Sequence, residues 1–544
     1  MPHIPHDVPK IKGIHLVILF SLILNVIGIR YGLPGYQGWG PDEVLPRDVK
    51  EGIGRCFSND WFRKYPPFHY YLLALTQAPF LIFSELRGVD FKELSFYSCL
   101  FLAGRFLSLF MGAGLIFFVY KCGREIFDQR SSLWAASIAA LIVPFVYHAK
   151  TTNLDIPYLF WFMISGYFFL RLLKTRQRKY YLFFALTAVL TVCTKDQAYG
   201  LYVLPPLFVL FSDWRFEKKT MPNLTAVRFL FNRTYLYAVL VALGTFFLVY
   251  NLAFNAQGFL HHVQEITGPK IKAYRLYPNT LSGHLHLLRR ALDQIRFSLG
   301  WPLFLVCVAG LFRSLVSKPR NLLLLSLLTF AVPYDILYVH VIGFNYARYY
   351  LPVCIILSFF GGEFLTFALE PRPKFKRVFQ AAVAVIFLYS LLYAFSLNIY
   401  MMKDSRYIAA KWVRCNIPKD ATIGVVDWIC YAQHLDAYRW FFVTPYLVDF
   451  RKLSPKPDYI IIDAEFFRGY SPDSPELRFF ENFYRGEEKY QLVFRSQTLL
   501  PWLPLRDREI RLHINQINPE IKIYKKMQLS RQLFPPEKSR TGKG

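Results

Sequence analysis

The sequence predicts a polytopic α-helical membrane protein that carries a small α/β domain at its carboxyl end. First, 54% of the 544 residues are hydrophobic and 18% are aromatic, which is too apolar for a soluble protein of this length. Second, the apolar residues come in long blocks, and many blocks approach the roughly 20 residues that a helix needs to cross the hydrocarbon core. Third, after residue 398 the apolar runs become short and alternating, which is typical of strands.

Eleven blocks are expected to cross the membrane, judged by the length of each apolar run. The first, Ile14 to Arg30, has no small-residue cleavage site and is interpreted as a signal anchor. The blocks at 180–194 and 199–214 are short, so we expect them to be tilted or partly re-entrant. The other eight candidate spans are 97–120, 132–150, 156–173, 234–254, 297–315, 321–340, 349–369 and 378–398.

Basic clusters between the spans predict the orientation of the chain. One cluster lies at 171–179 and contains no acidic residue, and similar clusters lie at 218–233, 313–320 and 372–377. With these spans all four clusters fall on one side, which should be cytoplasmic. The amino end is then inside and the tail outside, in the cell (inner or plasma) membrane. Because these loops hold much of the basic charge behind the net charge of +27, nucleic acid is not expected as a partner.

The same topology places the first loop, residues 31–96, wholly outside the membrane. The helix expected from Pro66 to Phe83 then cannot cross, and we interpret it as a juxtamembrane helix, with an ordinary span as the alternative. Polar residues and proline interrupt its apolar run, and tyrosines near its start favour the headgroup region. These residues are His69, Thr76, Gln77 and Pro79, and Tyr65, Tyr70 and Tyr71.

An acidic pair, Asp42–Glu43, lies in a turn rich in glycine, proline and tryptophan directly after the first span. One carboxylate can accept a proton from an attacking hydroxyl or amine, and a second can position the nucleophile or a metal. The alternative is a helix cap beside a solvated loop acid. The place of the pair, between the first span and the juxtamembrane helix, favours catalysis at a membrane surface.

Two further charged residues lie at outer ends of spans. Asp155 precedes Pro157, so it can cap the next helix, face a site, or do both. Arg348 lies among tyrosines at an outer membrane boundary. It can bind a phosphate with its guanidinium fork, or it can extend to the interface as arginines near helix ends do.

Arg105 and Lys195 are also candidates for the outer-face site. Arg105 lies within the outer half of a span and needs an anionic partner or water, for which Asp335 is a candidate. Lys195, followed by Asp196, can bind a substrate or form a paired turn.

The sequence assigns no cofactor and leaves a divalent metal open. His261–His262 and His284/His286 invite a metal interpretation, but adjacent histidines rarely converge on one ion and ligand spacing is lacking, so a structural role is favoured. The chain contains no P-loop and no Gly-x-Gly-x-x-Gly motif, so a nucleotide cofactor is unsupported.

Over residues 14–400 the chain resembles the membrane-embedded C-type glycosyltransferases. The nearest groups are the dolichyl-phosphate-mannose protein mannosyltransferases and the lipid A aminoarabinose transferases. Lys64–Tyr65 departs from the lipid A enzymes, which carry an acid and a lysine there, and this argues against lipid A as acceptor. The resemblance rests on the order of the acidic pair, Tyr65-Pro66-Pro67, Arg105-Phe-Leu-Ser108, Asp155 and Arg348-Tyr-Tyr-Leu-Pro352.

The resemblance implies hexosyl or pentosyl transfer from a polyprenyl-phosphate-linked donor to an acceptor at the outer face, with inversion. It implies Asp42 as catalytic base with Glu43 beside it, Asp155 as the second outer acid, and Arg348 on the donor phosphate. The expected partners are this donor, membrane lipids and an acceptor that the sequence leaves unknown (lipid, glycan or protein). The candidate substrate-binding residues are Asp155, Arg348, Tyr346, Arg105, Lys195, His69 and Tyr70.

Three domains are expected: a transmembrane glycosyltransferase module at 1–398, an extracytoplasmic α/β domain at 399–530, and a disordered tail at 531–544. In the α/β domain, a helix is predicted at 407–414, where Pro418 ends it soon afterwards. Strands are predicted at 421–426, 458–463, 491–494 and 521–524.

Two other classes of protein remain as alternatives. A transporter or flippase of lipid-linked saccharides should show paired halves with broken helices at matching depth, and the sequence shows no internal repeat. A structural membrane subunit, including an inactive transferase, is less favoured because the acidic pair is intact.

Overall fold

The computed structural model describes residues 13–62, 64–268, 275–370, 376–426, 435, 437–443, 456–463, 481, 483, 485–486, 489–514 and 516–527. The chain divides into two compact units, which are described separately. The first comprises residues 1–403 and 499–517, and the second comprises 404–498 and 518–544. The tail at 531–544, for which we predicted disorder, lies outside the described residues.

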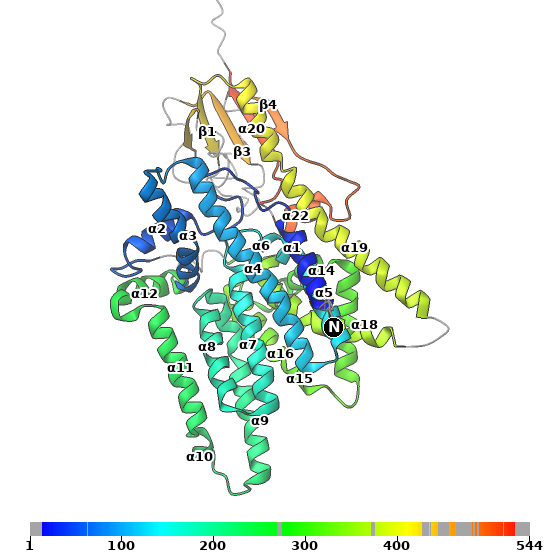
Figure 1. Ribbon diagram of the computed structural model, residues 1–544. Helices are drawn as coiled ribbons and strands as arrows, with labels where there is room; N and C mark the ends of the chain where they lie inside the picture. Colours follow the sequence, from blue (N-terminus) through cyan, green and yellow to red (C-terminus); the bar gives the residue numbers. More distant parts are fainter. Residues whose placement is uncertain are drawn as a thin grey trace, which may run out of the picture. The chain divides into compact units, whose positions relative to one another are not determined.

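The first unit is helical, and its helices run side by side (Figure 1). Helix α18 packs against both α5 and α14, α4 packs against α5 and α7, and α8 packs between α7 and α11. The helices are α1 (Gly13–Val26), α2 (Pro46–Gly54), α3 (Phe68–Arg87), α4 (Leu94–Ile126), α5 (Gln129–Ala140), α6 (Val143–His148), α7 (Asp155–Thr175), α8 (Arg178–Val192), η1 (Asp196–Tyr202), α9 (Leu204–Thr220), α10 (Ala226–Leu230), α11 (Arg233–Val249), α12 (Leu252–Thr267), α14 (Leu281–Val316), α15 (Leu322–Ser326), α16 (Leu328–Tyr334), η2 (Asp335–Val339), α17 (His340–Ile342), η3 (Ala347–Tyr350), α18 (Leu351–Ala368), α19 (Lys376–Met402) and α22 (Asp507–His513).

Close packing of α18 depends on small residues. A Cβ added at Gly362 would lie 2.6 Å from the carbonyl oxygen of Ser131 and 2.7 Å from the amide nitrogen of Ala135. Helix α18 therefore meets the backbone of α5 directly, as small residues allow where helices pack inside a bilayer.

The chain is a multi-pass membrane protein. Six helical stretches are long and apolar enough to cross a membrane, and a seventh is reached if α11 and α12, which meet at 83°, count as one span. The predicted fold class is thereby confirmed. The expected number of eleven spans stays a prediction. Helices α1, α5, α8 and α9 have 14, 12, 15 and 17 residues, which is fewer than the 18 residues required of a helix that counts as a span. The six stretches are Leu94–Ile126, Asp155–Thr175, Leu281–Val316, Leu322–Ile342, Ala347–Ala368 and Lys376–Asn416.

Helix α3 corresponds to the expected juxtamembrane helix. It has 20 residues, contains Pro79, and ends at Gly88 in the left-handed conformation that closes many helices. It is not among the spanning stretches found in the described part of the chain. At its start, Tyr70 packs edge-to-face on Trp61, with ring centroids 5.2 Å apart, in a buried cluster that also holds Val44 and Val49. Helix α3 therefore supports the loop that follows the acidic pair.

The second unit is an α/β domain with a five-stranded mixed sheet in the order β2-β1-β3-β5-β4. Strands β2, β1 and β3 are parallel, whereas β5 runs antiparallel to both β3 and β4. All four predicted strands and the predicted helix are found, and β2 was missed because its sequence, Arg-Trp-Phe-Phe, shows no alternation. The elements are α20 (Ser405–Asn416), β1 (Thr422–Val426), β2 (Arg439–Phe442), β3 (Tyr459–Asp463), β4 (Tyr490–Ser496) and β5 (Ile521–Lys526).

Between β4 and β5 the chain returns to the first unit, although the sequence prediction placed 399–530 in one domain. Helix α22 in this segment packs against α14. There, Arg296 pairs with Glu509 at 2.9 Å, and His513 stacks on Phe297 with ring centroids 4.2 Å apart.

Candidate active site

The two members of the acidic pair face different surroundings. Asp42 has a backbone φ of +54°, a left-handed conformation that aspartate tolerates better than most residues. The side chain of Asp42 is 25% exposed, whereas that of Glu43 is 1% exposed. The pair therefore consists of one accessible carboxylate and one buried carboxylate.

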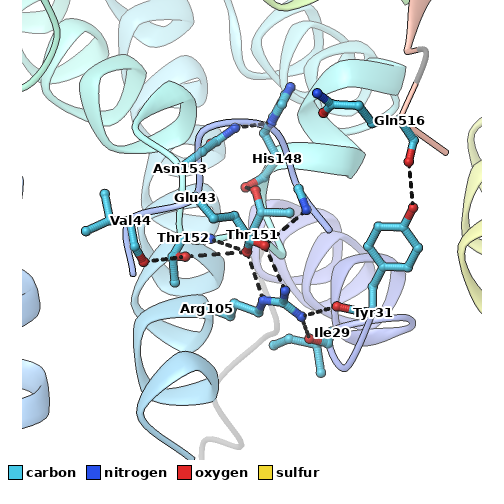
Figure 2. A network of polar contacts seen from close by, with 11 residues as sticks. Ile29, Tyr31, Glu43, Val44, Arg105, His148, Thr151, Thr152, Asn153 and Gln516 are labelled. Carbon is cyan, nitrogen blue, oxygen red and sulfur yellow. Dashed lines mark hydrogen bonds and ion pairs between the residues drawn. The ribbon is translucent and has the colours of Figure 1, made fainter. Parts of the chain in front are cut away.

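The Glu43 carboxylate is held on all sides by the protein (Figure 2). The guanidinium of Arg105 donates to its two oxygens through Nε and Nη2, each at 3.0 Å. The backbone N–H of Thr152 donates to Oε1 at 3.0 Å, and that of Gly40 donates to Oε2 at 3.1 Å. A carboxylate accepts about four hydrogen bonds, so these contacts leave little capacity for a substrate proton.

Gly38 makes room for this carboxylate. A Cβ at position 38 would lie 1.6 Å from Oε2 of Glu43. The glycine-rich turn seen in the sequence is therefore required by the close approach of the Glu43 side chain to the backbone.

Arg105 joins this turn to the exit of α1. It is fully buried, and its Nη1 donates to the carbonyl oxygens of Ile29 at 2.8 Å and Tyr31 at 2.7 Å (Figure 2). Its anionic partner is Glu43, whereas the sequence analysis considered Asp335 for this role. Arg105 was expected to bind substrate and Glu43 to take part in catalysis. In the structure the two side chains bind each other and the surrounding backbone.

Asp42 is paired with two cations. Lys64 Nζ lies 2.9 Å from Oδ1, and Arg348 Nη2 lies 2.6 Å from Oδ2. Burial would raise the pKa of Asp42, but Arg348 and Lys64 outweigh this effect and hold that pKa well below its usual range. Asp42 is therefore an ionised, weakly basic carboxylate in this state.

Arg348 connects Asp42 to a second carboxylate. Its Nη1 lies 3.9 Å from Oδ2 of Asp155, and Oδ1 of Asp155 lies 2.5 Å from Nζ of Lys195. Arg348 lies on η3, Asp155 begins α7, and Lys195 directly precedes η1. Three cations and two carboxylates from separate parts of the sequence thus form one continuous chain of charges, with an excess of one positive charge.

Tyrosines surround this chain of charges. Arg348 lies over the rings of Tyr346 and Tyr349, 5.7 and 5.8 Å from their centroids, and Lys195 lies 5.6 Å from that of Tyr158. Tyr346 is 43% exposed and flanks the predicted phosphate-binding arginine.

His69 and Tyr70 belong to the packing of α3. His69 is fully buried, burial lowers its pKa to about 3, and neither ring nitrogen has a hydrogen-bond partner among the residues that the structure describes. Tyr70 packs on Trp61. The predicted role of both side chains in substrate binding stays a prediction.

Sequence reasoning missed Lys64 and Tyr65 as site residues. Lys64 pairs with Asp42, and burial, together with the nearby Asp42 carboxylate, raises the pKa of Tyr65 well above its usual range. The available signal was a basic and an aromatic residue directly before Pro66-Pro67. In the sequence these two residues served to judge the acceptor, and Tyr65 also served to place the juxtamembrane helix.

The residues present do not fit a divalent metal. The carboxylates of Asp42 and Asp155 share Arg348, and each has a lysine as its second partner. In the ranges that the structure covers, no three His, Cys, Asp or Glu side chains are grouped as metal ligands. Cations therefore occupy the positions that a metal would need.

Residues 95–233 match the sequence model of the dolichyl-phosphate-mannose-protein mannosyltransferase family. The match confirms the resemblance to the membrane-embedded C-type glycosyltransferases that the sequence predicted. The matched range contains Arg105, Asp155 and Lys195, and it leaves Asp42 and Arg348 outside.

Solved structures of two other proteins show a distant likeness. ArnT from Cupriavidus metallidurans, solved bound to undecaprenyl phosphate, is 12% identical over 94% of this chain and 98% of its own, with a TM-score of 0.46. The oligosaccharyltransferase AglB from Archaeoglobus fulgidus, solved with an inhibitory peptide and a dolichol-phosphate, is 14% identical over 90% of this chain and 73% of its own, with a TM-score of 0.47. Both TM-scores are below 0.5. A comparison with curated protein sequences gave no match.

Proposed function

We propose that this protein is a glycosyltransferase that moves a sugar from a polyprenyl-phosphate-linked donor to an acceptor, with Asp42 as the general base. The observation that carries the proposal is the chain of charges from Lys64 through Asp42, Arg348 and Asp155 to Lys195. It offers a carboxylate for proton transfer beside an excess of positive charge for a phosphate. The family match over residues 95–233 supports a donor of this class.

The reaction is a single displacement. Asp42 accepts the proton of the acceptor hydroxyl or amine while that atom attacks the anomeric carbon. The bond between this carbon and the phosphate oxygen breaks, and polyprenyl phosphate leaves with an additional negative charge. Lys64 and Arg348 stabilise that charge, and attack from the opposite side inverts the anomeric centre. We place the reaction at the outer face of the cell membrane, where no nucleotide sugar is available, and no step needs a metal.

The resting ion pairs of Asp42 have a consequence for this mechanism. A carboxylate held by two cations is a poor base, because its pKa lies far below the operating pH. A donor phosphate competes for the same cations. We propose that donor binding draws Arg348 or Lys64 from Asp42 to the phosphate and thereby makes the carboxylate more basic.

We expect the acid limb of kcat to lie at a higher pH than the acid limb of kcat/KM. The pH dependence of kcat/KM reports the free protein, in which Arg348 and Lys64 lower the pKa of Asp42. The pH dependence of kcat reports the donor complex, in which one cation has moved to the phosphate. Loss of a cation removes an effect that lowers the pKa, so the pKa in the complex must be higher. Transfer rates measured between pH 4 and 8 at limiting and saturating donor check this. A fall of kcat toward low pH, in a range where kcat/KM stays flat, is the expected result, and coincident limbs would contradict it.

Arg348→Lys is expected to raise the KM for the donor about 10- to 100-fold, because lysine keeps the charge but loses one charge-assisted hydrogen bond of the fork. Steady-state transfer kinetics with labelled donor measure the effect. Arg87→Lys, at the end of α3, is the matched control and should leave KM unchanged. An unchanged KM in Arg348→Lys would remove Arg348 from the donor phosphate.

The proposed function is tested with the purified protein in lipid nanodiscs and a panel of radiolabelled polyprenyl-phosphate sugars, both hexosyl and pentosyl. Transfer to an acceptor, or slow hydrolysis of one donor, is the expected result. Donor that is bound and moved between leaflets of a proteoliposome without cleavage would instead identify a transporter. If the protein neither binds nor cleaves any donor of the panel, both the transferase and the transporter hypotheses are rejected.

A further inference from the structure

A second buried cation, Lys150, lies at the exit of α1. Helix α1 ends at Val26, and Gly28 follows with a φ of +82°. The last carbonyl groups of a helix have no partner within it and must be satisfied from elsewhere. Here Lys150 Nζ donates to the carbonyl oxygens of Leu24 at 3.3 Å and Ile27 at 2.8 Å.

Asn398 on α19 completes this contact. Its Oδ1 accepts from Lys150 Nζ at 2.5 Å, and its Nδ2 donates to the same Leu24 carbonyl at 2.8 Å. The ammonium group has three donors, and it meets three acceptors. Lys150 is fully buried and forms no ion pair within the described ranges, so its charge faces the negative end of α1.

The segment that carries Lys150 also holds the acidic turn. Two residues later, Thr152 donates from its N–H to Glu43, and its carbonyl accepts from the N–H of Val44 at 3.2 Å. Five residues later, Asp155 begins α7 and lies beside Arg348. Arg105 also connects the acidic turn to the end of α1, because it binds both Glu43 and the carbonyls that follow α1.

We propose that Lys150 is a positioning residue of the transfer reaction. Its ammonium fixes segment 149–155 on the end of α1, and so sets the distance between Asp42 and Asp155 across Arg348. Lys150 touches neither carboxylate. It acts through the two backbone segments that are joined by the hydrogen bond from the N–H of Val44 to the carbonyl of Thr152. This inference rests on the proposed function and adds a residue that neither the motifs nor the family match identify.

The test uses the full-length protein with Lys150→Met, which keeps most of the aliphatic stem and removes the ammonium. With a donor that the wild type transfers, kcat is expected to fall about 100-fold while the KM for the donor changes little, because small misplacements of reacting groups cost rate more than binding. Asn398→Ala removes one acceptor and the second donor to Leu24, and should give a smaller fall in kcat. Arg313→Met, which breaks a partly buried ion pair with Glu363 elsewhere in the same unit, is the control.

A second measurement does not depend on the reaction. Hydrogen–deuterium exchange of peptides covering 41–46 and 149–156 reports the N–H groups of Val44 and Thr152 directly. Exchange should become faster in these peptides in Lys150→Met and stay unchanged in α18 and in the part of α7 that follows residue 156. This arm holds even if the wild type transfers no sugar, so failure of the proposed function and failure of this inference are distinguishable.

Three outcomes would overturn the inference. One is a kcat within twofold of wild type while only the melting temperature falls, because that describes a purely structural lysine. Another is a raised KM at constant kcat, which would place Lys150 on the donor. The third is unchanged exchange in the two peptides. If Lys150→Met does not fold, Asn398→Ala is judged by the same three measurements.

Discussion

We expect Asp42→Asn to transfer sugar about 10²- to 10⁴-fold more slowly than the wild type, the range typical of a lost general base. Asparagine keeps the shape of the side chain but cannot accept the acceptor's proton. The KM for the donor should not rise, because the variant removes the anion that competes with the donor phosphate for Arg348 and Lys64. Initial rates with the radiolabelled donor identified from the panel measure both quantities.

The control for this variant is Asp90→Asn, an exposed acid of the same outer loop. It should keep wild-type kinetics. Asp90→Asn should melt within a few degrees of the wild type, since substitutions at exposed positions rarely change stability. Asp42→Asn removes the anionic partner of Lys64 and one partner of Arg348, so its elution and melting temperature are measured to show that it is folded before rates are compared. Activity retained in Asp42→Asn would move the active site away from the acidic turn, and Asp155 would then be the next carboxylate to replace.

The second large effect is expected on stability. Arg105→Met should lower the free energy of unfolding by about 3–5 kcal/mol, because it leaves the Glu43 carboxylate buried without its counter-charge. The variant also leaves the carbonyls of Ile29 and Tyr31 without a donor. Thermal unfolding followed by intrinsic fluorescence in detergent should show a clear fall in melting temperature.

A double variant separates the charge from the packing. Glu43→Gln combined with Arg105→Met removes both charges, so it should be less destabilised than the sum of the two single variants. Arg313→Met, which breaks a more exposed pair with Glu363, should change the stability by about 1 kcal/mol or less. If Arg105→Met is as stable as Arg313→Met, the buried pair does not anchor the acidic turn.

These two predictions assign different roles to neighbouring acids that the sequence treats as a pair. Asp42 is partly exposed and accepts the proton in the proposed mechanism, whereas Glu43 is buried and bonded to the backbone of the turn and to Arg105. A variant of Glu43 that loses activity would therefore not identify a second catalytic group, unless its stability and the exchange of the Val44 amide were unchanged.

Local sequence patterns were sufficient to predict the class of fold. Long apolar blocks are stable as helices inside a bilayer, and short alternating runs after residue 398 are typical of strands. The membrane spans and the sheet were therefore both predictable from local hydrophobic patterns. The sequence also drew attention to Asp42, Asp155, Arg348 and Lys195 at the outer ends of apolar blocks. The structure brings these four residues together, and their roles stay a prediction.

The partners of these residues follow from long-range contacts that the sequence does not show. Glu43 turns away from Asp42 because Arg105, 62 positions along the chain, supplies a buried partner, and no local pattern reports a contact of that sequence separation. Lys64 likewise reaches Asp42 from 22 positions along the chain, through a loop whose path cannot be predicted from local sequence preferences. The return of 499–517 to the first unit is likewise a matter of long-range packing.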